Sequence, residues 1–179
     1  MSDVDIAQAA PSVQAIHMAG AIAILSGILS AIGLVLLIAM FAFFATPLKV
    51  AGLTVGTLND ICVALQYLLT IPIALALYQI LLAYNPALIR IATIIGIAAM
   101  LLVVGLQLLL IFGVLTLQQQ VIWVCLAMFL GVGFWLVTTG LMARSTGRLP
   151  NSVLMSILAL PYVGYPVWAI WLGLHLLSW

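Results

Sequence analysis

The sequence has very few charged residues. Only 4% of its 179 residues are Asp, Glu, Lys or Arg, and Glu is absent. A water-soluble domain of ordinary composition carries roughly a quarter charged residues, so this chain lacks the groups that a water-facing surface needs. The net charge is +1 and no cluster of Lys or Arg occurs, which argues against nucleic acid as a partner. The composition therefore predicts a protein that lipid surrounds.

Cysteine and catalytic motifs are also scarce. Cys62 and Cys125 lie in apolar runs without CxxC spacing, so neither a disulfide framework nor a zinc site is predicted, and their redox state stays open. The apolar runs contain no paired acid and base, no HExxH motif and no Gly-rich phosphate loop. We therefore expect a protein that is not an enzyme and has no cofactor.

Long apolar runs take the place of these features. A helix needs about 20 apolar residues to cross about 30 Å of hydrocarbon. Thr46-Pro47 and Asn85-Pro86 mark boundaries between runs, and Thr116 and Gln119 fit a capping box at a third boundary. We expect one all-α integral membrane domain over residues 1–179, a five-span transmembrane helix bundle with spans at about 13–45, 58–82, 86–115, 118–143 and 151–177.

The last of these runs contains Pro161, Gly164 and Pro166. Each proline removes a backbone hydrogen bond, so the pattern predicts a proline-kinked last helix. If this run were two helices, each piece would be too short to cross a bilayer. The expected number of spans is therefore five.

The few cations predict an orientation. If the spans alternate, Arg90, Arg144 and Arg148 lie on the side of the N-terminus, and Lys49 lies on the opposite side. Short cytoplasmic loops carry the excess of Lys and Arg. We expect the N-terminus in the cytoplasm and, with five spans, the C-terminus outside.

Small residues recur in the first run at four-residue spacing: Ala19, Ala23, Gly27 and Ala31. In a bilayer, such a ridge lets two helix backbones approach closely. It predicts a packing face, either against another helix of the same chain or against a partner subunit.

Some polar residues lie within or beside the predicted spans. Thr57 and Asp60 fit a capping box at the start of the second span, although an acid there could also belong to a site. Other polar and aromatic side chains lie in the predicted outer half of the bundle, where they could either line one pocket or pair between helices. The candidate polar cluster is Asp60, Gln66, Tyr67, Gln107, Trp168, Trp171 and His175.

The two histidines lie near opposite ends of the chain, His17 in the first span and His175 in the last. The expected topology puts them on opposite sides of the membrane, which disfavours a haem held by both. One histidine alone, His17 or His175, could still hold a pigment.

Several short stretches resemble a bacterial family of multi-pass membrane proteins known as domain of unknown function 4386. They are Leu58-Asn59-Asp60 with Ala64-Leu65-Gln66-Tyr67, Gly140-Leu141 with Gly147-Arg148-Leu149-Pro150, and Gly164-Tyr165-Pro166-Val167-Trp168. The resemblance implies a location in the bacterial cell inner membrane. It implies no activity and no site residues.

Two functions agree with these features. The first is a structural or accessory membrane subunit that assembles with other membrane subunits or with a second copy, favoured by the small-residue ridge. The second is a small transporter, channel or lipophilic-ligand-binding protein that uses the outer polar cluster. In both, the lipid bilayer is the main surrounding partner.

Overall fold

A computed structural model describes residues 12–43, 48–50, 52–146 and 161–179. Four long apolar helical stretches dominate it: α1 (Val13–Ala42), α2 (Val55–Leu81), α3 (Pro86–Ile111) and a continuous stretch from Leu117 to Thr146. Each is long and apolar enough to cross a membrane, and the shorter α7 (Pro161–Leu177) follows. The predicted all-helical, membrane-embedded bundle agrees with this architecture at that level.

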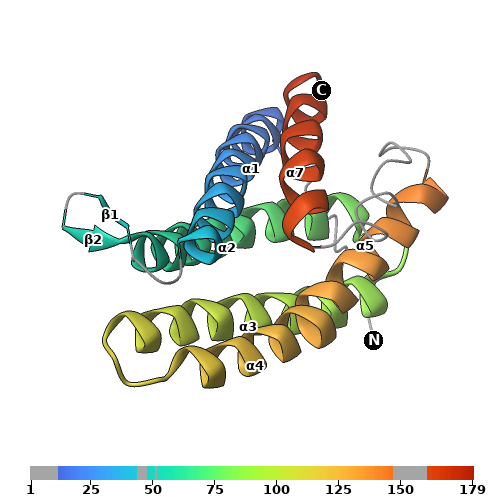
Figure 1. The fold of residues 1–179 in the computed structure, drawn as a ribbon. Helices are drawn as coiled ribbons and strands as arrows, with labels where there is room; N and C mark the ends of the chain where they lie inside the picture. The colour runs from blue at the N-terminus through green and yellow to red at the C-terminus, as the bar shows by residue number, and fades with distance from the viewer. Residues whose placement is uncertain (1–11, 44–47, 51, 147–160) are drawn as a thin grey trace.

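The remaining elements are small. The fourth long stretch consists of α4 (Leu117–Leu126), a π-helical segment η1 (Ala127–Val132) and α5 (Gly133–Thr146). Between α1 and α2, β1 (Lys49–Val50) and β2 (Leu53–Thr54) form an antiparallel ribbon. This ribbon projects beyond the ends of the two helices (Figure 1).

Side chains at the helix starts explain most of the boundaries. Asn85 accepts a hydrogen bond from the backbone N–H of Leu88, with Pro86 in the first turn, and Thr116 forms the predicted capping box with Gln119. The capping box predicted for Thr57 and Asp60 is wrong. The helix begins one turn earlier, because Thr54 accepts the backbone N–H of Thr57 at 3.1 Å.

The helices pack in a chain of neighbours. Helix α1 lies against both α2 and α7, α2 lies against α3, and α3 lies against the α4–η1–α5 stretch. Figure 1 shows α3 and α4 as a hairpin, as the short predicted connection between them required. Gly113 turns this hairpin with φ of +71°, a conformation that glycine adopts without strain.

Glycines set the contact between α1 and α7. A Cβ on Gly20 would lie 2.9 Å from the carbonyl oxygen of Gly173, and a Cβ on Gly27 would lie 2.9 Å from that of Pro166. Gly20 contacts Gly173, whereas Gly27, further along α1, contacts Pro166, which comes earlier in α7. The two helices are therefore antiparallel. The end of α7 therefore lies beside the start of α1, as Figure 1 also shows.

This arrangement differs from the one expected for five spans. In a five-span protein the first and last spans run in the same direction, whereas α1 and α7 run in opposite directions. The sides of the membrane on which the two ends of the chain lie stay a prediction. Helix α7 has 17 residues, about 25 Å at 1.5 Å per residue, and residues 151–160 of the predicted fifth span lie outside the described residues.

Glycines also set the contact between α3 and the fourth stretch. A Cβ on Gly96 would lie 2.7 Å from the Trp135 side chain, and Gly131 lies directly against Ala99. These two contacts fix an antiparallel register between α3 and α5. Gly131 belongs to η1, and π-helical segments of this kind are frequent near functional sites.

Candidate functional site

Three hydroxyl groups meet where α1, α2 and α7 come together. The Tyr165 hydroxyl is hydrogen-bonded to Ser26 at 2.8 Å and to Thr70 at 2.5 Å. All three residues are buried. We call Ser26, Thr70 and Tyr165 the hydroxyl cluster; it ties α7 to the first two helices in the interior of the bundle.

The backbone of α2 supplies an acceptor to this cluster. The Gln66 carbonyl oxygen accepts the Thr70 hydroxyl at 2.8 Å and the Ser26 hydroxyl at 3.3 Å. Pro72 lies inside the same helix and has no N–H to donate. The carbonyl that Pro72 leaves without its helical N–H is that of Leu68, so the bonds to the Gln66 carbonyl are additional to the helical ladder.

Aromatic rings extend the cluster toward α5. The ring of Tyr165 lies 5.6 Å from that of Trp168, and the ring of Trp168 meets that of Trp135 edge to face at 6.2 Å, measured between centroids. Trp135 is fully buried and Trp168 is 3% exposed.

Hydrogen-bonding groups without partners gather around these two tryptophans. Among the described residues, the indole N–H groups of Trp135 and Trp168 and the hydroxyls of Thr93 and Thr139 are buried and lack a hydrogen-bond partner. We call Thr93, Trp135, Thr139 and Trp168 the central donor cluster. Such groups are uncommon in native proteins, and a bound water or ligand is one way in which they are satisfied.

The register between α3 and α5 brings the two threonines together. Gly96 faces Trp135, so one turn further along both antiparallel helices Thr93 faces the turn that contains Thr139. Thr139 also follows Trp135 by four residues and therefore lies on the same face of α5. Thr93, Trp135 and Thr139 therefore lie between α3 and α5, and Trp168 of α7 joins them through its ring contact with Trp135.

The polar groups of this region offer more hydrogen-bond donors than acceptors. An indole offers a donor only, and a threonine hydroxyl offers a donor and an acceptor. No Asp, Glu, Lys or Arg occurs between residues 91 and 143 or after Arg148. The central donor cluster therefore suits an uncharged group that carries acceptor oxygens.

The structure separates the predicted outer polar cluster. Asp60 is half-buried beside Asn59, which faces Gly33 of α1, whereas His175 lies at the end of α7 near Gly20. Thirteen residues of α1 separate these two levels, roughly 20 Å along a helix. Asp60 and His175 therefore do not share a site.

Its other members form local pairs. Gln107 accepts a hydrogen bond from the Gln120 side chain at 2.7 Å, within the α3–α4 hairpin. His175 stacks on Trp171 with ring centroids 6.0 Å apart and accepts the indole N–H of Trp179 at 3.0 Å. The remaining two, Gln66 and Tyr67, are buried on α2, and Trp168 belongs to the central donor cluster.

The two histidines also lie differently from the prediction. Because α1 and α7 are antiparallel, His17 and His175 lie toward the same end of this helix pair, which removes the argument from opposite sides of the membrane. His17 has a buried Nε2 without a partner. No group of three His, Cys, Asp or Glu suited to a metal occurs in the described part of the chain, and Cys62 and Cys125 are both free thiols there.

The small-residue face of α1 is occupied within the chain. Ala19 and Ala23 are buried, Gly27 contacts α7, and Ala31 is half-buried. The first of the two predicted uses, contact with helices of the same chain, accounts for these residues.

Reading the sequence missed Thr70, Thr93 and Thr139, because single threonines within apolar runs resemble ordinary helix residues. The available signal was the i, i+4 pair of Trp135 and Thr139. Comparison with protein families, curated proteins and solved structures finds no match to this chain.

Proposed function

We propose that this protein binds a small uncharged molecule with hydrogen-bond-accepting oxygens at the central donor cluster, within the membrane. The observation that supports this most is the gathering of four buried groups able to donate a hydrogen bond, on three helices, all without a partner. An unsatisfied buried group costs about 1–3 kcal/mol, so four in one region are a large cost unless something binds there.

The surroundings define the chemical class of the ligand. The four side chains lie in apolar helices, and the nearest charged residues along α3 and α5 are Arg90 and Arg144, toward one end. A charged ligand would lose its hydration without an opposite charge to replace it. Carbonyl or ether oxygens on an apolar body fit donors in such a setting.

The hydroxyl cluster would hold the α7 wall of this site. Trp168, a member of the site, lies one helical turn from Tyr165, and the Tyr165 hydroxyl contacts Ser26 of α1 and Thr70 of α2. A positioned Trp168 would keep its N–H directed at the ligand, since bound groups gain most from donors that are already in place.

The alternative of an accessory subunit has lost its main support. It was favoured by the small-residue ridge of α1, which α2 and α7 cover in this chain. We therefore propose ligand binding in preference to an accessory role, and we propose no enzymatic activity.

We also propose a location and an orientation. Arg90 at the start of α3 and Arg144 at the end of α5 lie at the end of the bundle where α1 starts, and Lys49 lies at the other end. Cytoplasmic segments of membrane proteins carry the excess of Lys and Arg. In the proposed orientation, the start of α1 and the end of α7 therefore face the cytoplasm. The cell inner membrane of a bacterium is the proposed membrane, on the resemblance described above.

Mass spectrometry of co-purifying small molecules tests the proposed function. Protein extracted in mild detergent is precipitated with organic solvent, and the released neutral compounds are quantified per mole of protein. We expect one oxygen-containing compound in the wild type and its loss from the Thr93→Val/Thr139→Val double variant. Trp123→Phe, at an exposed tryptophan, is the control. Equal amounts of every released compound in all three proteins would contradict the proposal.

A further inference from the structure

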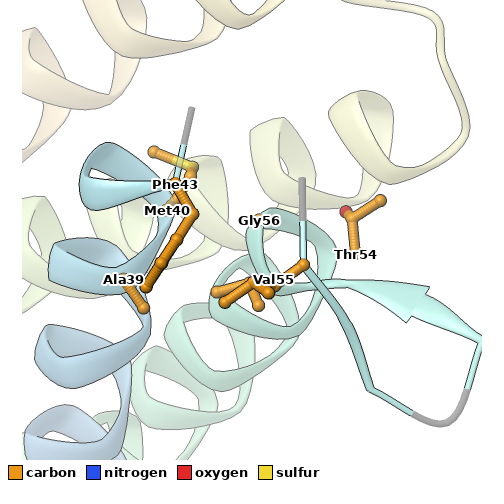
Figure 2. Close-up of a pocket in the computed structure, with 7 residues that line it drawn as sticks. Ala39, Met40, Phe43, Thr54, Val55 and Gly56 are labelled. Atoms are coloured by element: carbon orange, nitrogen blue, oxygen red, sulfur yellow. The ribbon is translucent and has the colours of Figure 1, made fainter. Parts of the chain in front are cut away.

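A pocket lies at the other end of α1, away from its contact with the end of α7. Figure 2 shows the site, where the last turns of α1 meet the start of α2 and the β ribbon. Its volume is about 300 Å³. The lining residues are Ala39, Met40, Phe43, Leu48, Thr54, Val55 and Gly56.

The interior of this pocket is apolar. Thr54 brings the one side-chain polar atom of the lining, and that oxygen is engaged in capping α2: it accepts the backbone N–H of Thr57 at 3.1 Å and is hydrogen-bonded to the Thr57 hydroxyl at 2.8 Å. Among the lining residues that the structure describes, no side-chain oxygen or nitrogen is left to select a polar ligand. The pocket therefore suits hydrocarbon.

A cation lies at its edge. In the ribbon, Lys49 pairs directly with Thr54, and paired residues of neighbouring strands project on the same face. Leu48, the residue before Lys49, also lines the pocket. Lys49 is exposed and is the only lysine of the chain.

The pocket lies at one end of the membrane-length helices. It lies where one membrane-length helix ends and the next begins, and the ends of such helices lie near the lipid headgroups. A phospholipid presents a phosphate at that level and acyl chains below it. An apolar pocket beneath an exposed ammonium group is complementary to both parts.

We propose that this pocket holds an acyl chain of an anionic phospholipid from the surrounding bilayer, with the Lys49 ammonium paired to the headgroup. The site is separate from the central donor cluster, because its lining residues belong to α1, the ribbon and the start of α2, whereas the cluster belongs to α3, α5 and α7. It does not depend on the proposed function.

Native mass spectrometry with defined lipids tests this inference. Delipidated full-length protein is incubated with equal amounts of phosphatidylglycerol and phosphatidylcholine, and the bound lipids are counted. We expect the wild type to retain phosphatidylglycerol preferentially. Lys49→Gln should lower that preference about fivefold, the effect of roughly 1 kcal/mol per lysine near a membrane surface. Arg90→Gln, a cation at the other end of the bundle, is the matched control.

A second variant tests the pocket itself. Met40→Trp fills the space between α1 and α2 and should remove the retained lipid of both kinds, while Phe41→Trp, at an exposed neighbouring position, should not. Melting temperatures of both variants without lipid show whether they are folded; if Met40→Trp is not, Ala39→Leu replaces it. Unchanged preference in Lys49→Gln, equal losses in Lys49→Gln and Arg90→Gln, or full retention in the filled variant would each overturn the proposal.

Discussion

Trp135 and Trp168 meet edge to face, with ring centroids 6.2 Å apart and planes inclined by 85°. They come from α5 and α7, and both carry an indole N–H that is buried without a partner. An edge-to-face pair gains about 0.5–1.5 kcal/mol from its ring contact, but that gain does not satisfy the two N–H groups. The ring contact therefore accounts for the packing of the pair, while both N–H groups stay available to donate a hydrogen bond.

The threonines of the central donor cluster give a first prediction. Thr93→Val and Thr139→Val each replace an unsatisfied buried hydroxyl with a methyl group of similar volume. In the ligand-free protein, each change should raise the free energy of unfolding by up to about 1 kcal/mol, because the desolvated hydroxyl is removed. The thermal midpoint of the detergent-purified variants measures this. A stabilised protein that has lost its ligand is the expected result of the double variant.

The control for that prediction is Thr70→Val. Its hydroxyl donates to the Gln66 carbonyl and is hydrogen-bonded to Tyr165, so its removal should lower stability. A rise in the midpoint for Thr70→Val, or a fall for both other variants, would show that the distinction between satisfied and unsatisfied hydroxyls is wrong.

Tyr165→Phe gives the second prediction. The change removes the Tyr165 hydroxyl, which lies within hydrogen-bond distance of Ser26 and Thr70 and can donate its proton to one of them, but leaves the ring against Trp168. Hydrogen bonds between membrane helices contribute about 0.6 kcal/mol each on average, so we expect a loss of roughly 1 kcal/mol. Equilibrium unfolding in mixed micelles measures it. Tyr78→Phe, on α2 away from the cluster, should stay within the error of the wild type, and an equal loss in both would count against the cluster.

The contact between α1 and α7 gives the third prediction. A Cβ at Gly173 would lie 2.5 Å from the Gly20 carbonyl oxygen and 3.0 Å from the Ile24 backbone nitrogen, so backbone must move to admit it. Gly173→Ala should destabilise the protein by about 1–3 kcal/mol, as overpacking does. Gly105→Ala, where a Cβ meets nothing within 4 Å, should be neutral or slightly stabilising. Similar midpoints for the two variants would contradict the packing of α7 on α1.

The direction of α7 gives the fourth prediction. Epitope tags fused at the two ends of the chain should both be cleaved by protease added to inside-out membrane vesicles and both be protected in right-side-out vesicles. The physical reason is the antiparallel packing of α1 and α7, which puts the start of one beside the end of the other. Tags accessible from opposite sides would restore the five-span topology and reject this packing.

The sequence predicted the long helices well, because hydrocarbon thickness sets their length and local capping sets their ends. Asn85-Pro86 and the capping box of Thr116 with Gln119 were both read correctly. The predicted start of α2 was wrong, because this helix end depends on a contact with another segment. Thr57 and Thr54 fit an N-cap equally well in the sequence. The ribbon selects Thr54, since the Val55 N–H is bonded to the Leu48 carbonyl.

The direction of α7 and the position of the site could not be read from the chain. Apolar periodicity does not state which helix faces which, so the register that pairs Gly20 with Gly173 and Gly96 with Trp135 has no local signal. Conspicuous polar residues such as Gln107 and His175 proved to pair locally, and the unsatisfied groups belong to inconspicuous threonines and tryptophans.

The most direct test of ligand binding uses the two tryptophans themselves. In a protein with Trp123, Trp171 and Trp179 changed to Phe, the fluorescence comes from Trp135 and Trp168 alone. A short-chain benzoquinone, an uncharged probe with two carbonyl oxygens, is titrated into this protein in lipid nanodiscs. We expect saturable quenching at one probe per protein, with binding weakened at least tenfold by Thr93→Val/Thr139→Val. Quenching that rises linearly with probe and is the same in both proteins would contradict this expectation.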